Sequence, residues 1–170
     1  MLSAPELLTS DHALERFDSG VASLDMWLRR RALQNQVSGA SRSFVVCDDS
    51  WVVAYYALSA GAVAPDAASS RFRRNMPDPV PVVVLGRLAV SQTHQDQGLG
   101  RALFQDAARR VIQAADAIGI RGMLVRAVSD EAKSFYLRLG LTVSPIEPLT
   151  LMATVADLNL ALGAGLSSRR

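Results

Sequence analysis

A strongly apolar, β-branched run, Val82–Val90, is followed by a polar loop, two glycines and a long segment with helical periodicity. Such a run is typical of a strand buried on both faces of a sheet. Beyond Gly98 the apolar side chains recur at helical spacing up to Gly119, a natural helix stop. They are Leu99, Leu103, Ala107, Val111, Ala114 and Ile118. The sequence therefore predicts a strand, a glycine-containing loop and a helix in direct succession.

The loop between this strand and this helix has the properties of a diphosphate site. A helix N-terminus offers unpaired N–H groups and the positive end of the helix dipole. Gly98 and Gly100 let a ligand approach the backbone, and Arg101 adds a positive charge. The loop is not a nucleotide P-loop, because no Gly-Lys-Ser/Thr follows the glycines. It is not a dinucleotide-binding fingerprint either, because residue 103, where the third glycine would fall, is leucine. A turn that merely contains two glycines is the alternative.

The remaining segments complete an α/β pattern. We expect one domain over residues 1–170, with a core at about 9–160 and loose ends at about 1–8 and 163–170. The arginine-rich, proline-containing stretch 65–81 should be mostly loop. Predicted helices run from an N-cap at Ser23 to Gln36 and from Ser129 or Asp130 to Leu139, and further strands are Ser43–Cys47, Trp51–Leu58, Ile120–Val128, Leu141–Val143 and Leu149–Thr154.

Composition favours a soluble, cytoplasmic protein. The longest uncharged apolar stretch, Val52–Ala64, is shorter than a membrane span, and no secretion signal is visible. Cys47 is the only cysteine, which fits a reducing compartment and predicts a buried, unreactive thiol. His12 and His94 stand apart from it in sequence, so we expect no metal site.

Six arginines fall into two short clusters although the net charge is only +2. They are Arg29, Arg30, Arg31, Arg71, Arg73 and Arg74. Such clusters bind phosphates in some proteins, and in others they are a solvated basic face. Trp27 and Trp51 have the spacing of core residues, so we expect both to be structural.

Two motifs resemble those of the Gcn5-related N-acetyltransferase (GNAT) family. Gln95-x-x-Gly98-x-Gly100 is similar to the family's pyrophosphate-binding signature, although Asp96 stands where relatives often carry glycine. The segment 132–141 resembles the closing motif, with leucine as its last residue. The resemblance implies a mixed central sheet that is splayed at the acetyl-CoA site and flanked by helices. It also implies that main-chain groups bind acetyl-CoA. The pantetheine arm would pair with Leu88, Ala89 and Val90. The pyrophosphate would lie on Gln95, Gln97, Gly98, Leu99, Gly100, Arg101 and Ala102.

The same resemblance implies direct attack of an amine on the thioester, without an acyl-enzyme. Tyr136 occupies the position of the general acid, and its phenol stays protonated at neutral pH. A tyrosine that only covers the core is the alternative. No general base is evident, which favours an acceptor whose amine is partly neutral at physiological pH.

Further segments are similar to the acetyltransferase toxins of bacterial type II toxin–antitoxin modules. They include 17–28, 85–90 and Arg74-Asn-Met-Pro. The resemblance implies that the chain acetylates the α-amine of aminoacyl-tRNA, blocks translation and is neutralised by a ribbon-helix-helix antitoxin. Candidate tRNA contacts are Arg29, Arg30, Arg73, Arg74 and Arg87. A homodimer is compatible with this family. The alternatives are acetylation of small molecules or protein N-termini, and a non-catalytic acyl-CoA-binding module.

Overall fold

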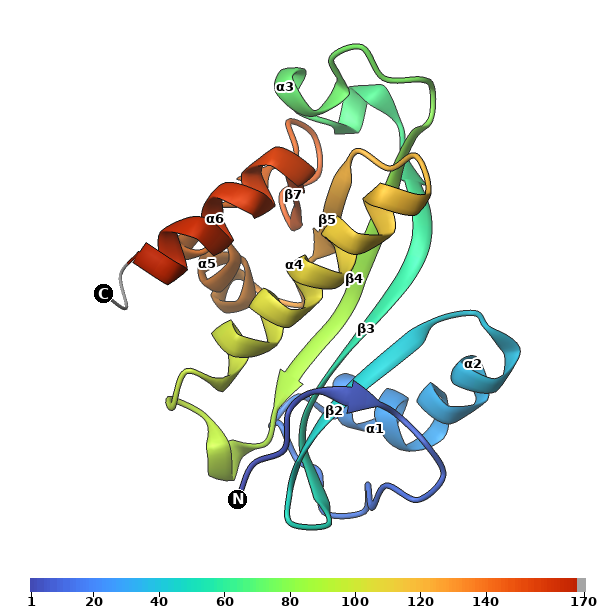
Figure 1. The fold of residues 1–170 in the computed structure, drawn as a ribbon, viewed down its shortest axis with the longest axis vertical. Helices are drawn as coiled ribbons and strands as arrows, with labels where there is room; N and C mark the ends of the chain where they lie inside the picture. Colours follow the sequence, from blue (N-terminus) through green and yellow to red (C-terminus); the bar gives the residue numbers. More distant parts are fainter. Residues whose placement is uncertain (168–170) are drawn as a thin grey trace. The chain divides into compact units, whose positions relative to one another are not determined.

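The computed structural model describes residues 1–167, and the side chains of residues 1–163. Its strands form one mixed sheet of seven strands in the order β1-β2-β3-β4-β5-β7-β6, with helices beside it, which confirms the predicted α/β class (Figure 1). The strands are β1 (Glu6–Leu7), β2 (Arg42–Asp48), β3 (Trp51–Val63), β4 (Val80–Val90), β5 (Gly122–Arg126), β6 (Thr142–Val143) and β7 (Thr150–Thr154). The α-helices are α1 (Ala22–Arg30), α2 (Ala32–Ser38), α3 (Ser70–Arg73), α4 (Leu99–Ala117), α5 (Asp130–Arg138) and α6 (Val155–Ser167). Among the described residues, no helix combines the length and apolarity that crossing a membrane requires.

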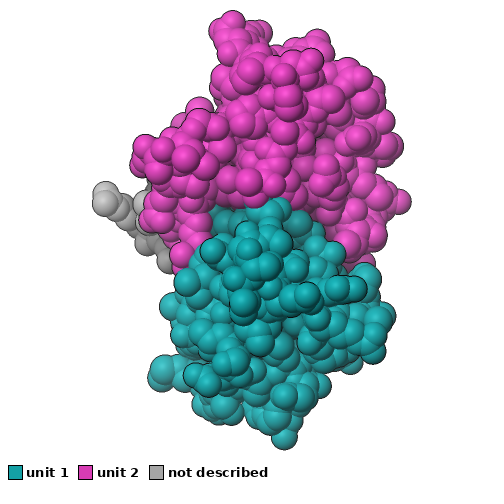
Figure 2. All heavy atoms as spheres, turned by 90° about the vertical axis from the view of Figure 1, so that its right-hand side faces the viewer, with its two compact units in different colours: residues 1–59, 86–107 teal, residues 60–85, 108–170 magenta. Residues whose placement is uncertain are grey.

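The chain divides into two compact units, each assembled from two separate stretches of sequence. Unit 1 contains residues 1–59 and 86–107, and unit 2 contains residues 60–85 and 108–170 (Figure 2). Strands β3 and β4 and helix α4 each begin in one unit and continue in the other. The single domain expected over residues 1–170 stays a prediction.

Unit 1 is built on the β2–β3 hairpin, whose antiparallel register confirms the predicted strand pair. Helix α1 supplies Leu24 and Leu28 to a core that includes Phe17, Tyr55 and Ala89. The Tyr55 ring is fully buried and lies parallel to the indole of Trp27, with 6.0 Å between ring centroids. The prediction that Trp27 packs against the core is therefore confirmed.

Unit 2 contains the parallel part of the sheet. Val82–Leu85 of β4 pair with 122–125 of β5, and β5 pairs with β7 in antiparallel register. Phe72 of α3, Val80, Leu124 and Met152 form its buried core. Ser129 caps α5 by accepting a hydrogen bond from the Ala132 N–H, as the sequence predicted.

Three predictions, one about a helix and two about the chain termini, were wrong. The helix expected from Ser23 to Gln36 is two helices, α1 and α2, because Arg31 leaves helical geometry at φ −121°. The N-cap of α1 is Val21 and not Ser23. The N-terminus is tied down: β1 pairs with β2, and Leu8 is buried. The C-terminal stretch forms α6 as far as Ser167, and the last residues of the predicted loose end lie outside the described residues.

Candidate functional site

The strand–loop–helix unit has the predicted order. β4 ends at Val90, a short 3-10 turn (η2, Gln92–His94) follows, and α4 starts at Leu99. The first backbone hydrogen bond into this helix runs from the Ala102 N–H to the Gly98 carbonyl. The N–H groups before it have no carbonyl partner within the helix, so they are available to an anion. Residues 95–98 are exposed, which leaves that approach open.

The backbone of this loop adopts the left-handed conformation at two positions, Asp96 (φ 61°) and Gly98 (φ 79°). Glycine accepts this conformation readily, and aspartate is among the few other residues that do so often. The left-handed geometry at Asp96 is one that a glycine at this position would also adopt. A Cβ added at Gly98 would meet no protein atom within 4 Å. The glycine thus keeps space open for a ligand and makes no tight protein packing.

The side chain of Gln95, the first residue of the signature, holds the loop in place. Its Nε2 donates hydrogen bonds to the carbonyl oxygens of Ser19 and Val90, each at 2.9 Å. This links the loop to the end of β4 and to the segment before α1. Because the amide nitrogen is engaged in this way, a contribution of Gln95 to anion binding would come from its main chain.

The end of β4 extends past its ladder with β5. The parallel pairing stops at Leu85 and Val125, so Gly86–Val90 have no partner in that ladder. Backbone groups that a neighbouring strand does not use need another partner. This agrees with main-chain pairing of pantetheine to Leu88, Ala89 and Val90, which stays a prediction.

Tyr136 lies on α5 with 6% of its surface exposed, and its ring packs edge-on against Phe135. Burial raises the pKa of its phenol above the ordinary value. The hydroxyl is therefore fully protonated across the physiological range, as a proton donor must be. Its role in catalysis stays a prediction.

The arginines predicted to contact tRNA differ in their surroundings. Arg29, Arg30, Arg73 and Arg74 are exposed, whereas Arg87 is half-buried. Arg29 donates to the Phe17 carbonyl at 2.7 Å, and Arg73 donates to the Pro65 carbonyl at 3.3 Å. Arg71, in the second arginine cluster, forms an ion pair with Asp157.

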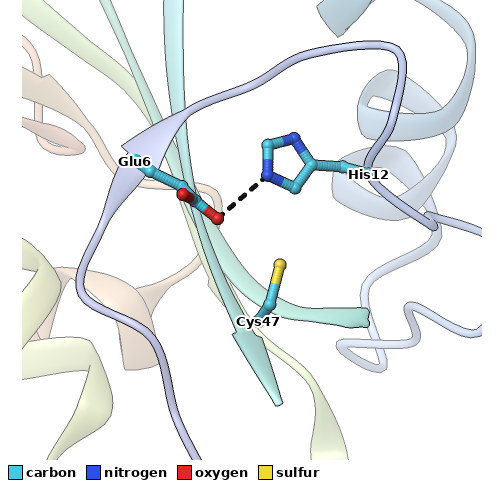
Figure 3. Close-up of side chains that lie close together, drawn as sticks. All are labelled: Glu6, His12 and Cys47. Atoms are coloured by element: carbon cyan, nitrogen blue, oxygen red, sulfur yellow. Dashed lines mark hydrogen bonds and ion pairs between the residues drawn. The ribbon is translucent and has the colours of Figure 1, made fainter. Parts of the chain in front are cut away.

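Glu6, His12 and Cys47 meet in space although Cys47 is far from the other two in sequence (Figure 3). The ligand atoms of all three lie within 4.8 Å of one another, a proximity that the sequence positions of His12 and Cys47 do not indicate. The Thr9 N–H donates to His12 Nδ1 at 2.9 Å, so the ring proton is on Nε2, which donates to Glu6 Oε1 at 3.1 Å. An Nε2 that carries the proton has no lone pair for a metal ion, and its hydrogen bond joins His12 to Glu6 within the N-terminal segment.

Cys47 itself is buried, as predicted. Burial, and after it the charge of Glu6, raise the pKa of its thiol. A thiol with a raised pKa is a poor nucleophile, because the thiolate is the reactive form.

Sequence reasoning missed a surface cavity of about 560 Å³ in unit 1. Its lining includes Trp51, over which the Arg16 guanidinium lies at 3.7 Å from the ring centroid. In the same wall, His94 Nε2 forms a hydrogen bond with Asp48 Oδ2 at 2.8 Å. This bond and the bond from the N-terminal amine lower the pKa of the Asp48 carboxyl below its ordinary value. No sequence motif joins these residues, since the hairpin turn and η2 meet only in the fold.

Comparison with known proteins agrees with this geometry. The family profile described as "Acetyltransferase (GNAT) domain" matches residues 40–142. The chain belongs to the GNAT acetyltransferase family. This GNAT chain is similar to the tRNA-acetylating toxin of Mycobacterium tuberculosis, with 49% identity over 161 residues. The match covers 95% of this chain and 97% of the relative.

Solved GNAT structures share the fold over nearly the whole chain. AtaT complexed with acetyl-methionyl-tRNAfMet superposes with a TM-score of 0.86 at 28% identity, covering 95% of this chain and 99% of that one. A tyrosine-to-phenylalanine variant of the AtaT toxin, bound to the C-terminus of the antitoxin AtaR and acetyl-CoA, gives 0.82 at 27% identity, with 96% and 99% covered.

Proposed function

We propose that this chain is a toxin that transfers the acetyl group of acetyl-CoA to the α-amine of aminoacyl-tRNA and so blocks translation. The observation that carries the proposal is the 49% identity, over 95% of the chain, to a tRNA-acetylating toxin. The similarity to AtaT in complex with acetyl-methionyl-tRNAfMet supports the same acceptor. Because charged tRNA is a cytoplasmic substrate, we expect the activity there.

The test is to incubate the purified protein with radiolabelled acetyl-CoA and total charged tRNA, and then to separate the aminoacyl ends. We expect label on the α-amines of the aminoacyl groups. Uncharged tRNA is the control, because it lacks the amine. Label that enters only peptides or small amines in parallel reactions would exclude the tRNA-directed function and select the other class of acetyltransferase.

In this proposal the loop and the first turn of α4 hold the pyrophosphate of acetyl-CoA. The ligating groups are main-chain amides between Gln95 and Ala102, assisted by the exposed side chain of Arg101. The part of β4 that extends past its ladder with β5 holds the pantetheine arm, which directs the thioester toward Leu88. A main-chain N–H near Val90 is available to stabilise the oxyanion of the tetrahedral intermediate.

Replacement of Gly98 by alanine tests this cofactor site. The substitution places a Cβ in the open space above the loop, where the pyrophosphate is proposed to lie. We expect the Kd for acetyl-CoA, measured by calorimetry, to rise about tenfold, which is the effect of losing one good hydrogen bond to a charged group. Strain in the left-handed conformation should lower the free energy of unfolding by about 1 kcal/mol.

Gly39 offers a matched control. It has the same left-handed conformation (φ 83°) at the C-terminus of α2, and an added Cβ there meets only the end of the Arg42 side chain at 3.9 Å. Gly39→Ala should have the same small effect on stability without changing the affinity for acetyl-CoA. Equal affinities for the two variants would count against the proposed cradle.

The transfer itself needs few groups in this proposal. The α-amine of an aminoacyl group has a pKa near or below about 8, so a fraction is neutral and attacks the thioester without an enzymic base. When the tetrahedral intermediate collapses, Tyr136 donates its phenolic proton to the departing thiolate of CoA. Attack forms the C–N bond and the oxyanion, and the proton lost by the amine passes to solvent. When the carbonyl re-forms, the C–S bond breaks and CoA leaves as the thiol.

The exposed arginines are proposed to contact the phosphate backbone of tRNA. Charge reversal by Arg73→Glu with Arg74→Glu should lower kcat/KM for charged tRNA at physiological salt by roughly tenfold or more, because phosphate contacts dominate such binding. The Kd for acetyl-CoA should not change.

Arg42→Glu with Arg109→Glu is the matched control for this reversal. Both of these arginines are exposed, and neither belongs to the two clusters. The same loss of tRNA activity in the control pair would show that the effect follows net charge and not a contact surface.

We further propose a ribbon-helix-helix antitoxin as the protein partner, and a homodimer as the assembly. The similarity to an AtaT toxin bound to its antitoxin supports the first. Co-expression with a ribbon-helix-helix protein, if one is encoded beside this gene, followed by size-exclusion chromatography with light scattering, tests both. A free monomer under these conditions would exclude both assemblies.

A further inference from the structure

Arg87 is a half-buried arginine in unit 1 that contacts an aromatic ring. Its guanidinium carbon lies over the indole of Trp27, at 4.3 Å from the ring centroid. Within the described part of the chain, none of its N–H groups donates a hydrogen bond to protein, and no carboxylate forms an ion pair with it. A guanidinium has five N–H donors in one plane, and stacking on an aromatic face leaves all of them free.

The groups around Arg87 do not neutralise its charge. The Tyr55 hydroxyl donates to the Leu24 carbonyl at 2.7 Å, and burial raises the pKa of that phenol, so the ring is neutral. The buried Asp25 carboxylate accepts from the N–H and hydroxyl of Ser19. Partial desolvation lowers the pKa of Arg87 itself. A cation held partly out of water with unused donors is completed by an oxyanion from a ligand.

The position of Arg87 indicates which oxyanion this is. Arg87 lies on β4 immediately before Leu88–Val90, the segment proposed to pair with pantetheine. The pyrophosphate loop follows the other end of this segment. The acceptor therefore arrives on the side of Arg87, and the phosphates of CoA lie at the other end. The α-carboxyl group of an aminoacyl-tRNA is esterified, so the anions that every aminoacyl-tRNA offers near its amine are the phosphodiesters of the 3′ end.

We propose that the Trp27-backed guanidinium of Arg87 binds a phosphodiester of the single-stranded 3′ end of the acceptor. This contact selects an amine carried on a nucleic acid over a free amine. The inference rests on the proposed function and adds to it a specificity-determining residue that acts apart from the exposed arginines. Arg87 in this role positions the acceptor and takes no part in proton transfer.

The test compares two acceptors that carry the same aminoacyl group, an aminoacyl-CCA trinucleotide and an aminoacyl-adenosine without phosphate. For Arg87→Gln we expect KM for the trinucleotide to rise about 10- to 100-fold, the range for a lost charge-assisted hydrogen bond. On charged tRNA the plot of log(kcat/KM) against log[salt] should become shallower by about 0.7, the slope of one single-strand phosphate contact. Turnover of aminoacyl-adenosine and the KM for acetyl-CoA should stay at the wild-type values.

Arg16→Gln is the matched control, because it removes another arginine that lies on a tryptophan in unit 1. It should leave the salt slope and the ratio of the two acceptors unchanged. The inference is overturned if Arg16→Gln has the same effect, or if Arg87→Gln reduces activity on aminoacyl-adenosine as much as on the trinucleotide. Failure of the wild-type protein to acetylate charged tRNA would instead refute the proposed function, so the two failures are distinguishable.

Discussion

Tyr136→Phe should lower kcat about 100-fold or more, the usual contribution of a positioned general acid. The substitution keeps the ring and its edge-on contact with Phe135, so the fold and the Kd for acetyl-CoA should be unchanged. In the proposed mechanism, the substitution removes only the proton donor to the CoA thiolate. Steady-state kinetics with charged tRNA and calorimetry with acetyl-CoA measure the two quantities separately.

The pH profile gives a second readout of the same residue. In the proposed mechanism Tyr136 acts in its protonated form, and burial raises its pKa above the ordinary value of about 10. Wild-type kcat/KM should therefore increase with pH as the acceptor amine loses its proton, and should show no decrease from Tyr136 below about pH 10. A decrease centred near neutral pH would point to a different acid.

Tyr56→Phe is the control for the loss of a buried phenol. Tyr56 is fully buried in unit 1, and its hydroxyl donates to Asp106. Its replacement should reduce stability and leave turnover at the wild-type level. If Tyr136→Phe turns over as fast as this control, Tyr136 is a residue that covers the core and not the general acid.

Gly122→Ala should reduce the free energy of unfolding by about 3 kcal/mol or more, the upper range for overpacking. Gly122 pairs with Thr154 across the β5–β7 ladder, and an added Cβ would lie 2.0 Å from the Ala153 carbonyl oxygen. The nearest atoms all belong to the backbone of β7, so they move away only if the ladder opens. Chemical denaturation followed by circular dichroism measures the loss.

Gly119→Ala makes the same substitution nearby without the clash. A Cβ at Gly119 meets no atom within 4 Å, so the free energy of unfolding should change by less than about 0.5 kcal/mol. Equal stabilities for the two alanine variants would show that β5 and β7 do not pack as closely as described.

The elements that the sequence predicted well are those with a continuous local signal. The apolar run at β4, the helical spacing of α4 and the Ser129 cap of α5 are each set by residues that are neighbours in the chain. The pyrophosphate loop belongs to this class, because its glycines and the helix start are adjacent. The left-handed conformation at Asp96 was not predicted, because an aspartate does not by itself indicate it.

The elements that sequence reasoning missed depend on distant contacts or lack a pattern. β1 has only two residues and is a strand because β2 lies beside it. In α6 the apolar residues are not confined to one face, since Leu158 is buried and Leu160 is exposed, and no clear stripe marks the helix. The Glu6–His12–Cys47 cluster and the Arg87–Trp27 contact join residues whose proximity exists only in the folded chain.

The division of the chain has a consequence for its synthesis. The backbone passes between the two units after Ser59, Leu85 and Ala107, so neither unit is a continuous stretch of sequence. No truncation of the gene would yield one unit alone, and on the ribosome unit 1 stays incomplete until residue 107 has emerged. Fragments cut at the middle of the chain should thus be unfolded, and a split-protein reporter based on this chain would need both halves to restore either unit.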